Sequence, residues 1–227
     1  MNSIYGIILS GGIGKRMNSE IPKQFLKIQD QSIIRHTVKN FKNWGLFKAL
    51  IIVSPAEFIE KTEKELDDLL DPTDRIIEGG KSRHDSTLNG LTALKFDNDL
   101  IVIHDAVRPF VTSKDLDEVT NGALEFGAST LAEKVNETLV SGENQKVSLI
   151  IDRENVFSIK TPQVLHSSIL KDLLSVELNE DPTDLCSWLK ALNIKPVLKE
   201  SNPLNIKITT NTDLIKAENF IKLFSFE

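Results

Sequence analysis

Residues 4–17 read IYGIILSGGIGKRM, a short apolar run followed at once by a glycine-rich, basic segment. The apolar part, Ile4–Leu9, is almost uninterrupted, and similar runs occur at Ala49–Val53 and Leu100–Ile103. Such runs are typical of strands buried on both faces, as in a parallel sheet. Apolar residues at helical spacing lie between the runs. The sequence therefore predicts alternating strands and helices in a layered α/β domain.

Two apolar helical faces and three helix starts are recognisable. The expected faces consist of Ile33, Ile34, Val38 and Phe41, and of Phe58, Ile59, Leu66, Leu69 and Leu70. Capping-box spacing is present at Thr112–Asp115 and again at Thr210 and Asp213, each ahead of an apolar run. Pro182 and Asp184 are expected in a first helical turn, which tolerates proline and favours acid.

The alternation is interrupted between Ser129 and Phe157, where the pattern reads strand, turn, strand. The tetrapeptide at residues 141–144, Ser-Gly-Glu-Asn, is the expected turn. We interpret residues 129–157 as a hairpin arm that projects from the domain. Because the chain contains no internal repeat, low-complexity tract or linker, a single domain over residues 1–227 is predicted.

Composition restricts the function classes. The chain has 227 residues with 27 Lys plus Arg and 33 Asp plus Glu, giving a net charge of −6. An acidic chain without a basic tract is a poor candidate for a general nucleic-acid binder. No apolar run approaches membrane-spanning length, and no signal-peptide pattern is visible. With the single cysteine, Cys186, no internal disulfide is possible, so we expect a cytoplasmic protein with no nucleic-acid or membrane partner.

The glycine-rich segment predicts a phosphate site. Glycines allow a tight turn whose N–H groups point at one spot, and Arg16 and Lys23 lie within reach of it. The segment is not a P-loop, because Leu9 stands where the first glycine is needed and Arg16 where a hydroxyl is needed. It also lacks the third small residue of the dinucleotide fingerprint, where Met17 stands.

Three motifs in order carry a resemblance to a known family. They are GIGKRM at residues 12–17 followed by PKQF at 22–25, GGKSRHDS at 79–86, and HDAVRP at 104–109. The chain resembles the cytidylyltransferases that act on polyol phosphates, which include methylerythritol phosphate and ribitol phosphate enzymes. Val107 departs conservatively from the alanine of the family motif. Further matches at Thr161-Pro162-Gln163, Thr183-Asp184-x-x-Ser187 and Asn205-x-Lys207-x-Thr209 extend the resemblance to most of the chain.

The resemblance implies a three-layer, Rossmann-like α/β fold of the nucleotide-diphospho-sugar transferase type. Its sheet would be mixed but mostly parallel, and the hairpin would be a protruding dimerisation arm. The implied reaction transfers CMP from CTP to a polyol phosphate with release of pyrophosphate. Because the acceptor phosphate is already ionised, catalysis would rest on alignment and charge neutralisation, with Mg²⁺ on the triphosphate.

The implied site has two halves. Arg16, Lys23, Arg153 and Lys207 would be the catalytic cations. The CTP half would comprise Ser10, Gly11, Gly12, Gly14, Gly79, Gly80, Arg83, Ser86 and Asp105. The polyol-phosphate half would comprise Asp105, Arg108, Thr138, Arg153, Thr161 and Lys207, with Arg153 supplied across a homodimer interface. No protein metal ligand is assigned, although Asp105 could help to hold Mg²⁺ or orient hydroxyl groups.

Three functions remain open on sequence grounds. The first is methylerythritol phosphate cytidylyltransferase, toward which Thr183-Asp184-x-x-Ser187 and Asn205-Ile206-Lys207 incline the interpretation. The second is an enzyme for ribitol phosphate or another polyol phosphate. The third is a catalytically silent nucleotide-binding module, which the presence of both Arg16 and Lys23 disfavours. Cys186 is interpreted as a small buried residue rather than a nucleophile.

Overall fold

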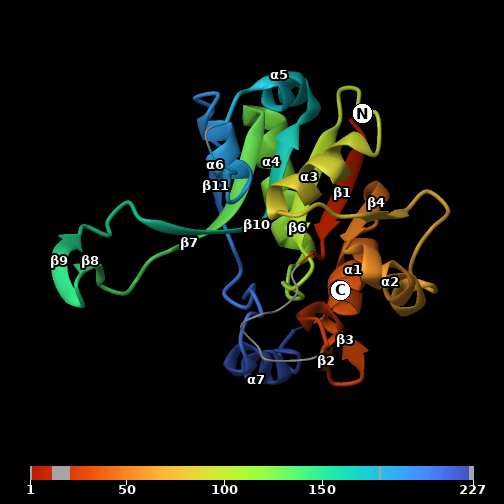
Figure 1. Cartoon of the computed structure of the whole chain (residues 1–227), viewed down its shortest axis with the longest axis horizontal. Coiled ribbons are helices and arrows are strands. Elements are labelled where there is room, and N and C mark those ends of the chain that lie inside the picture. The colour runs from red at the N-terminus through yellow and green to blue at the C-terminus, as the bar shows by residue number, and fades with distance from the viewer. Residues whose placement is uncertain (1, 12–20, 179, 225–227) are drawn as a thin grey trace.

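The computed structural model of the chain describes residues 2–11, 21–178 and 180–224. Within these residues the main sheet has seven strands in the order β11-β7-β10-β6-β1-β4-β5 (Figure 1). Neighbouring strands run parallel except around β10, which is antiparallel to both β6 and β7. The predicted mixed, mostly parallel sheet is confirmed. The strands are β1 Ile4–Leu9, β4 Phe47–Ser54, β5 Arg75–Glu78, β6 Leu100–Asp105, β7 Ala128–Lys134, β10 Phe157–His166 and β11 Val197–Glu200.

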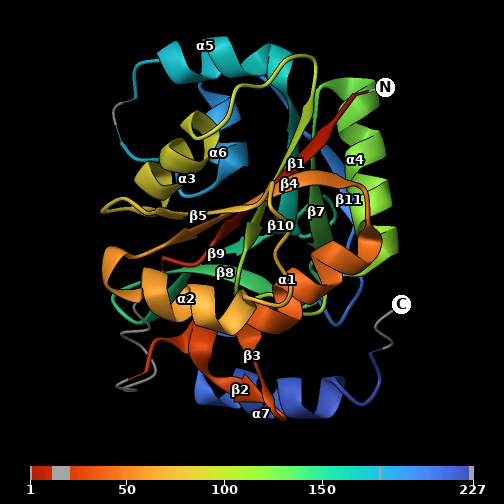
Figure 2. The same ribbon diagram turned by 90° about the vertical axis from the view of Figure 1, so that its right-hand side faces the viewer.

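Both faces of the sheet are covered, which explains the unbroken apolar runs. Successive residues of one strand, such as Ile7 and Ile8, belong to different apolar clusters because their side chains point to opposite faces of the sheet. Helices α1 Ile33–Trp44, α2 Ile59–Leu66 and α4 Ser113–Phe126 contribute to the cluster on one face. Helices α3 Arg83–Thr92, α5 Leu170–Ser175 and α6 Leu185–Lys190 contribute to the other. Figure 2 shows the sheet between these two helical layers.

A smaller unit closes the end of the molecule near the C-terminus. Helix α7, Asn211–Phe220, lies beside the short strands β2 Lys27–Ile28 and β3 Gln31–Ser32 (Figures 1 and 2). Their apolar side chains share a third cluster with Val107 and Ile208. Three short 3-10 helices complete the described elements: η2 Lys23–Phe25, η3 Ala56–Phe58 and η4 Ser167–Ile169.

The predicted helix starts are confirmed where side-chain caps define them. The Thr112 and Thr210 side chains each accept a hydrogen bond from the third helical residue, and the reciprocal bonds are also present. Asp184 caps α6 in the same way, but Pro182 lies two residues ahead of that cap and not in the first turn. Each such cap stabilises its helix by about 1 kcal/mol.

Two predicted boundaries are wrong. Helix α2 ends at Leu66, so Leu69 and Leu70 lie in the following turn, although both still pack against the core. In the arm, the turn lies at Asn144 and Gln145, whose φ angles are +50° and +62°. Residues 141–143 instead belong to the first arm strand.

The arm is a separate two-stranded sheet. Strands β8 Leu139–Glu143 and β9 Lys146–Ile151 pair antiparallel, and Figure 1 shows them well away from the main sheet. The flanking strands β7 and β10 belong to the main sheet, so the projecting part is shorter than residues 129–157. In the described part of the chain, no helix has the length and apolar character needed to span a membrane.

Candidate functional site

The candidate site lies at the carboxyl ends of the central parallel strands. Leu9 at the end of β1 is in register with Val53 of β4 and Asp105 of β6. Beyond the strands, the pairing continues through two backbone bonds of 2.8 Å, from Ser10 N to Val53 O and from Gly79 N to the carbonyl of residue 54. Loops that leave neighbouring strands therefore meet at this edge, where open α/β sheets bind their ligands.

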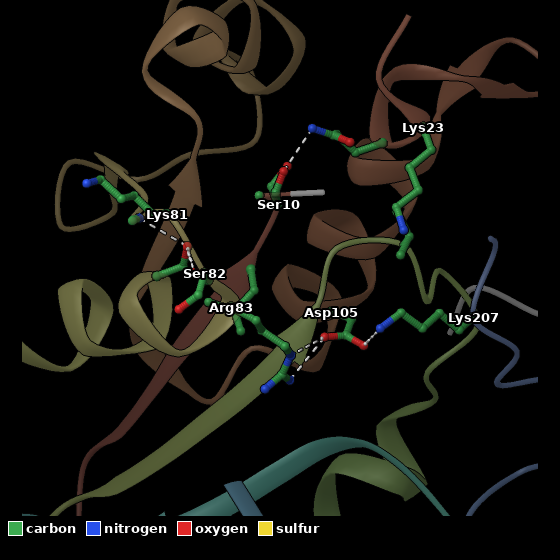
Figure 3. Close-up of a pocket in the computed structure, with 13 residues that line it drawn as sticks. Ser10, Lys23, Lys81, Ser82, Arg83, Asp105 and Lys207 are labelled. Carbon is green, nitrogen blue, oxygen red and sulfur yellow. Dashed lines mark hydrogen bonds and ion pairs between the residues drawn. The ribbon is translucent and has the colours of Figure 1, made fainter. Parts of the chain in front are cut away.

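These loops surround a cavity of about 210 Å³. Figure 3 shows Asp105 between Arg83 and Lys207, with Lys81 and Ser82 on one side of the cavity and Lys23 on the other. The described residues that line it are Leu9, Ser10, Gly11, Lys23, Gln24, Gly80, Lys81, Ser82, Arg83, Ser86, Asp105, Val107 and Lys207. The cavity therefore brings together the end of the first strand, the loop at 79–86 and the basic residues predicted for phosphate.

Asp105 is the centre of charge in this site. Its Oδ1 accepts hydrogen bonds from Arg83 Nε at 3.3 Å and Nη2 at 3.1 Å. Its Oδ2 lies 2.8 Å from Lys207 Nζ and 3.6 Å from Arg108 Nε. Burial alone would raise the pKa of the Asp105 carboxyl, but the three surrounding cations together hold that pKa well below its usual range. Asp105 is thus ionised at neutral pH, and the cations around it leave an excess of positive charge for an anionic ligand.

Arg108 and Thr161 lie behind the cavity rather than on its surface. Arg108 is 9% exposed, and its Nη1 donates to the Asn205 carbonyl at 3.1 Å. The Thr161 hydroxyl accepts from Asp105 N at 3.1 Å and contacts His104 Nδ1 at 3.1 Å. Both side chains contact Asp105, and the expectation that they face the second substrate stays a prediction.

His104 lies beneath the turn at residues 105–108, and its side chain is neutral. Its ring is completely buried and packs at a tilt on Phe41, with the ring centroids 4.9 Å apart. Burial lowers the pKa of His104 to about 3, so the imidazole carries no charge at neutral pH. His104 thus does not add to the positive charge of the cavity.

The loop at residues 79–86 is fastened by its own serines. Ser82, not Ser86, caps helix α3, through a reciprocal pair of bonds with Asp85. The Ser86 hydroxyl accepts from Gly80 N at 3.1 Å and donates to the Ser82 carbonyl at 2.9 Å. The Ser86 hydroxyl thus holds the loop closed at the cavity wall.

Gly80 must be glycine on steric grounds. A Cβ added there would lie 2.1 Å from Asp85 Cβ and 2.9 Å from the Asp85 carbonyl carbon. Contacts between real Cβ atoms and backbone are never that short, so a side chain at position 80 would push the loop away from α3. The glycine pair therefore permits the close approach of this loop to the helix end.

Gln24 joins the end of β1 to the segment that carries Lys23. It follows Lys23 in η2, is 1% exposed, and donates from Nε2 to the Ser10 carbonyl at 2.8 Å. The buried Ser10 Oγ and Gln24 Oε1 have no hydrogen-bond partner among residues 2–11, 21–178 and 180–224. The hydrogen bond from Gln24 to the Ser10 carbonyl keeps the Lys23 side of the cavity next to the first strand.

Comparisons with known proteins agree on one family. A family profile described as IspD, 2-C-methyl-D-erythritol 4-phosphate cytidylyltransferase, matches residues 4–223. A protein of that name from Leptospira borgpetersenii is 46% identical over 222 residues, which is 97% of this chain and 94% of the relative. One from Clostridium perfringens is 34% identical over 226 residues, 98% of this chain and 100% of the relative.

The chain belongs to the 2-C-methyl-D-erythritol 4-phosphate cytidylyltransferase family. The fold agrees with a solved structure of 4-diphosphocytidyl-2C-methyl-D-erythritol synthase from Anaerococcus prevotii. The TM-score is 0.83 at 24% identity, covering 97% of this chain and 96% of that one. The family resemblance inferred from the sequence motifs is confirmed.

Several residues predicted from the cytidylyltransferase resemblance do not meet in the cavity. Thr138 and Arg153 lie on the arm, where Arg153 is exposed and its Nη1 donates to the Asn136 carbonyl. Gly12, Gly14 and Arg16 fall outside the described residues. Gly79 lies at the base of its loop, while Gly80 and Gly11 line the cavity. Lys207 also lines it, and its segment has no strand pairing.

Five cavity residues of this family member were not predicted as site residues: Leu9, Gln24, Lys81, Ser82 and Val107. Ser82 could have been found, because Ser82 and Asp85 have capping-box spacing before a helix. Gln24 and Lys81 stand inside recognised motifs without a pattern that separates them from ordinary loop residues. Val107 entered only as a conservative departure, and its exposure to the cavity depends on tertiary packing.

Proposed function

We propose that this chain transfers CMP from CTP to 2-C-methyl-D-erythritol 4-phosphate, giving 4-diphosphocytidyl-2-C-methyl-D-erythritol and pyrophosphate in isoprenoid precursor synthesis. The observation that carries the proposal is the family match over residues 4–223. The cavity supports it, because Lys23, Arg83 and Lys207 surround one carboxylate at the ligand-binding edge of the sheet.

In the proposed reaction a phosphate oxygen of the acceptor attacks the α-phosphorus of CTP. The new P–O bond forms as the bond to the β-phosphate bridging oxygen breaks, and pyrophosphate leaves with that electron pair. A phosphate monoester is largely ionised at pH 7, so the attack needs no general base. The protein therefore contributes alignment and positive charge. We assign Lys23 and the backbone at Ser10–Gly11 to the triphosphate, and Lys207 to the acceptor phosphate.

We assign the nucleoside end of CTP to the loop at residues 79–86. The missing side chain at Gly80 lets its backbone pack against Asp85 of α3, and this packing sets the position of the main-chain groups that we assign to the base. Ser86 and Ser82 hold this backbone in place through the bonds at 3.1 and 2.9 Å. Arg83 forms an ion pair with Asp105. This pair connects the loop assigned to the nucleoside of CTP with the carboxylate beside the proposed acceptor site.

The described side chains fit Mg²⁺ only if the triphosphate supplies most of its ligands. Among the described residues no group of three or more His, Cys, Asp or Glu side chains could hold a metal. Asp105 supplies the carboxylate at the cavity, and both of its oxygens already contact cations. Mg²⁺ commonly keeps several waters and uses one or two carboxylates with substrate phosphates. Bound in this way, it would neutralise charge on the triphosphate, and Asp105 would be its protein ligand.

We further propose a homodimer formed through the arm. The β8–β9 sheet exposes large apolar side chains: Val140 is 46% exposed, Val147 65%, Leu149 61% and Ile150 69%. A two-stranded sheet with such a surface is marginal in water by itself. A second copy of the chain would cover it and would bring Arg153 and Thr138 to the partner's cavity. The lone cysteine, Cys186, leaves the fold independent of disulfides, which suits the cytoplasm that we propose for the reaction.

The test is a substrate panel with pyrophosphate release as the readout. The purified chain is given CTP, or another nucleoside triphosphate, with methylerythritol phosphate, ribitol 5-phosphate or no acceptor. We expect release only with CTP and methylerythritol phosphate. Turnover with ribitol 5-phosphate but not with methylerythritol phosphate would show that ribitol 5-phosphate is the acceptor. CTP binding without release in any combination would favour a silent nucleotide-binding module.

A further inference from the structure

The first turn of helix α3 carries three consecutive side chains that contact different parts of the molecule. Arg83 binds the Asp105 carboxylate, and Asp85 completes the cap of the helix. His84, between them, packs against Trp188 of α6 in an edge-to-face arrangement, with the ring centroids 4.5 Å apart and the ring planes at 82°. The turn is therefore fixed toward the sheet by Arg83 and toward α6 by His84.

His84 and Trp188 belong to none of the recognised motifs. The pattern Gly-Gly-x-x-Arg-x-x-Ser over residues 79–86 leaves position 84 free, and Thr183-Asp184-x-x-Ser187 ends one residue before Trp188. Neither side chain is among the described residues that line the cavity. Trp188 is 2% exposed, and its Nε1 has no hydrogen-bond partner in the described part of the chain. An unpaired N–H is costly to bury, so packing is what this ring contributes.

Helix α6 is itself anchored to the sheet. Gln163 of β10 is fully buried, and its Nε2 donates to Asp184 Oδ2 at 2.8 Å. Its Oε1 accepts from Leu185 N at 3.0 Å, so one side chain holds both the cap and the first residue of α6. Leu185 and Trp188 then enter the apolar cluster to which α3 also contributes. Trp188 therefore offers His84 a fixed surface.

We propose that His84 and Trp188 are positioning residues for the nucleoside of CTP. Their contact holds the first turn of α3, and with it the loop at residues 79–86, in the geometry that accepts the base. The inference rests on the assignment of the nucleoside to this loop in the proposed function. A loop released from the contact would occupy other positions as well, and the apparent Kd for CTP would rise as the binding-competent fraction falls. One aromatic pair corresponds to about a two- to tenfold change in such an equilibrium.

The test begins with His84→Phe and His84→Asn. Phenylalanine keeps a ring against Trp188 and lacks the ring nitrogens, whereas asparagine keeps hydrogen-bonding groups and lacks the ring. We expect asparagine to raise the Kd for CTP, measured by calorimetry, about fivefold, with KM for the acceptor within about twofold of the wild-type value. Phenylalanine should keep the wild-type Kd. A normal Kd with asparagine and a raised one with phenylalanine would show that His84 hydrogen-bonds the nucleotide directly, which would overturn the proposal.

Trp188→Leu separates positioning from direct contact with CTP. Because Trp188 is buried away from the cavity, it can influence CTP only through its neighbours. We expect Trp188→Leu to raise the Kd as much as His84→Asn does, and the double variant to bind CTP no more weakly than either single one, since both remove the same contact. Additive losses would show that His84 acts on CTP without Trp188 and would refute the proposal. If Trp188→Leu does not fold, the two His84 variants decide by the criterion above.

Phe96→Leu is the matched control. Phe96 follows the C-terminal end of α3 and packs edge-to-face on Tyr5, with the ring centroids 5.2 Å apart and the planes at 79°. Its loss should lower the Tm about as much as His84→Asn does and leave the Kd for CTP unchanged. An equal rise in Kd for Phe96→Leu would indicate a general effect of stability and would overturn the positioning role.

The outcomes also separate this inference from the proposed function. A wild-type chain that binds CTP but turns over no polyol phosphate refutes the proposed reaction, and the Kd comparison still decides the role of His84 and Trp188. A wild-type chain that turns over CTP and methylerythritol phosphate, together with asparagine and phenylalanine variants of equal Kd, refutes the inference alone. A wild-type chain that binds no CTP refutes both.

Discussion

The cavity and the arm hold their arginines in opposite ways. Arg83 and Arg108 both contact the Asp105 carboxylate, and Arg108 is almost completely buried. Arg153 on the arm is exposed and reaches only as far as the carbonyl of Asn136, on the facing part of the same arm. The cavity cations are therefore set in place before a ligand arrives, whereas the arm arginine occupies no ligand site formed by its own chain among the described residues.

The two regions therefore differ in how they would meet the triphosphate of CTP and the phosphate of the acceptor. A preorganised group of cations needs no rearrangement during the reaction, and preorganisation is the main source of electrostatic catalysis. In the homodimer proposed above, the arm would contribute to the partner's site, so its effect should appear in binding of the acceptor and depend on assembly.

Lys23→Ala should have the largest effect on turnover. Lys23 lines the cavity beside the end of β1, opposite the loop at 79–86 (Figure 3). We expect kcat to fall by about 10²–10³-fold, as for loss of one oxyanion donor, with a much smaller change in CTP affinity. The measurement is steady-state kcat alongside CTP binding by calorimetry. Equal losses in kcat and in affinity would mean that Lys23 serves binding and not the transition state.

Asp105→Asn should destabilise the cavity half of the molecule. The substitution leaves three cations without their carboxylate, and breaking such a buried pair costs about 3 kcal/mol. Because the folded pKa of Asp105 lies below its unfolded value, its stabilisation is present above the unfolded pKa of about 3.9 and is lost as pH falls through the folded pKa. Urea unfolding should thus show a constant gap between wild type and variant from pH 5 to about pH 8 that narrows only in strong acid.

Glu60→Gln, which alters an exposed carboxylate on α2, is the control for Asp105→Asn. Glu60 pairs with Lys64, and the two side chains are 81% and 75% exposed, so its loss should cost less than about 1 kcal/mol. The role of Asp105 at the centre of the cavity would be contradicted if Asp105→Asn lowered the free energy of unfolding as little as the control does. It would also be contradicted if the difference from wild type widened in acid.

Arg153→Ala should weaken use of the acceptor without affecting CTP. Loss of one charge-assisted phosphate contact costs about 2 kcal/mol, so kcat/KM for methylerythritol phosphate should fall about thirtyfold. Mixing this variant with Lys23→Ala tests the shared site directly. If each site uses Lys23 of one chain and Arg153 of the other, random exchange leaves about one quarter of the sites intact. No recovery of activity in refolded mixtures, or a fully active monomer, would rule out the shared site.

Local signals made much of the fold predictable. Ile4–Leu9 was recognisable as a strand because both faces are buried, and the starts of α4 and α7 because Thr112 and Thr210 form bonds within four residues. The arm turn was misplaced because Gly142 mimics a turn glycine but lies in a strand, next to the irregularity in register after Ser141.

The motifs of the site were predictable from the sequence, but which of their residues line the cavity and which are buried beneath it was not. The sequence identified Asp105, Arg108 and Thr161 together, yet did not reveal that Arg108 and Thr161 lie beneath the cavity. That placement depends on contacts between residues far apart in the chain, such as Thr161 with His104 and Asn205 with Arg108, 57 and 97 positions apart. Motif spacing carries no information about which of two neighbouring polar residues is covered by a distant segment.

A pair of glycine substitutions separates the two regions by their packing. At Gly80 an added Cβ would lie 2.1 Å from Asp85 Cβ, so Gly80→Ala must displace the loop from α3. At Gly142 on the arm the nearest atom would be the Lys146 carbonyl oxygen at 3.5 Å, an ordinary contact. We expect Gly80→Ala to cost about 1–3 kcal/mol in stability and to weaken CTP binding, and Gly142→Ala to change stability by less than about 0.5 kcal/mol.

Urea unfolding and CTP titration of both glycine variants measure this contrast. The prediction concerns geometry alone and stands whichever polyol phosphate is the acceptor. Normal CTP affinity in Gly80→Ala would show that the loop can move without loss of the nucleotide, which would remove the reason for placing the base there. A large loss of stability in Gly142→Ala would show that the arm is as closely packed as the cavity, and the division between a preformed cavity and an arm that depends on assembly would then fail.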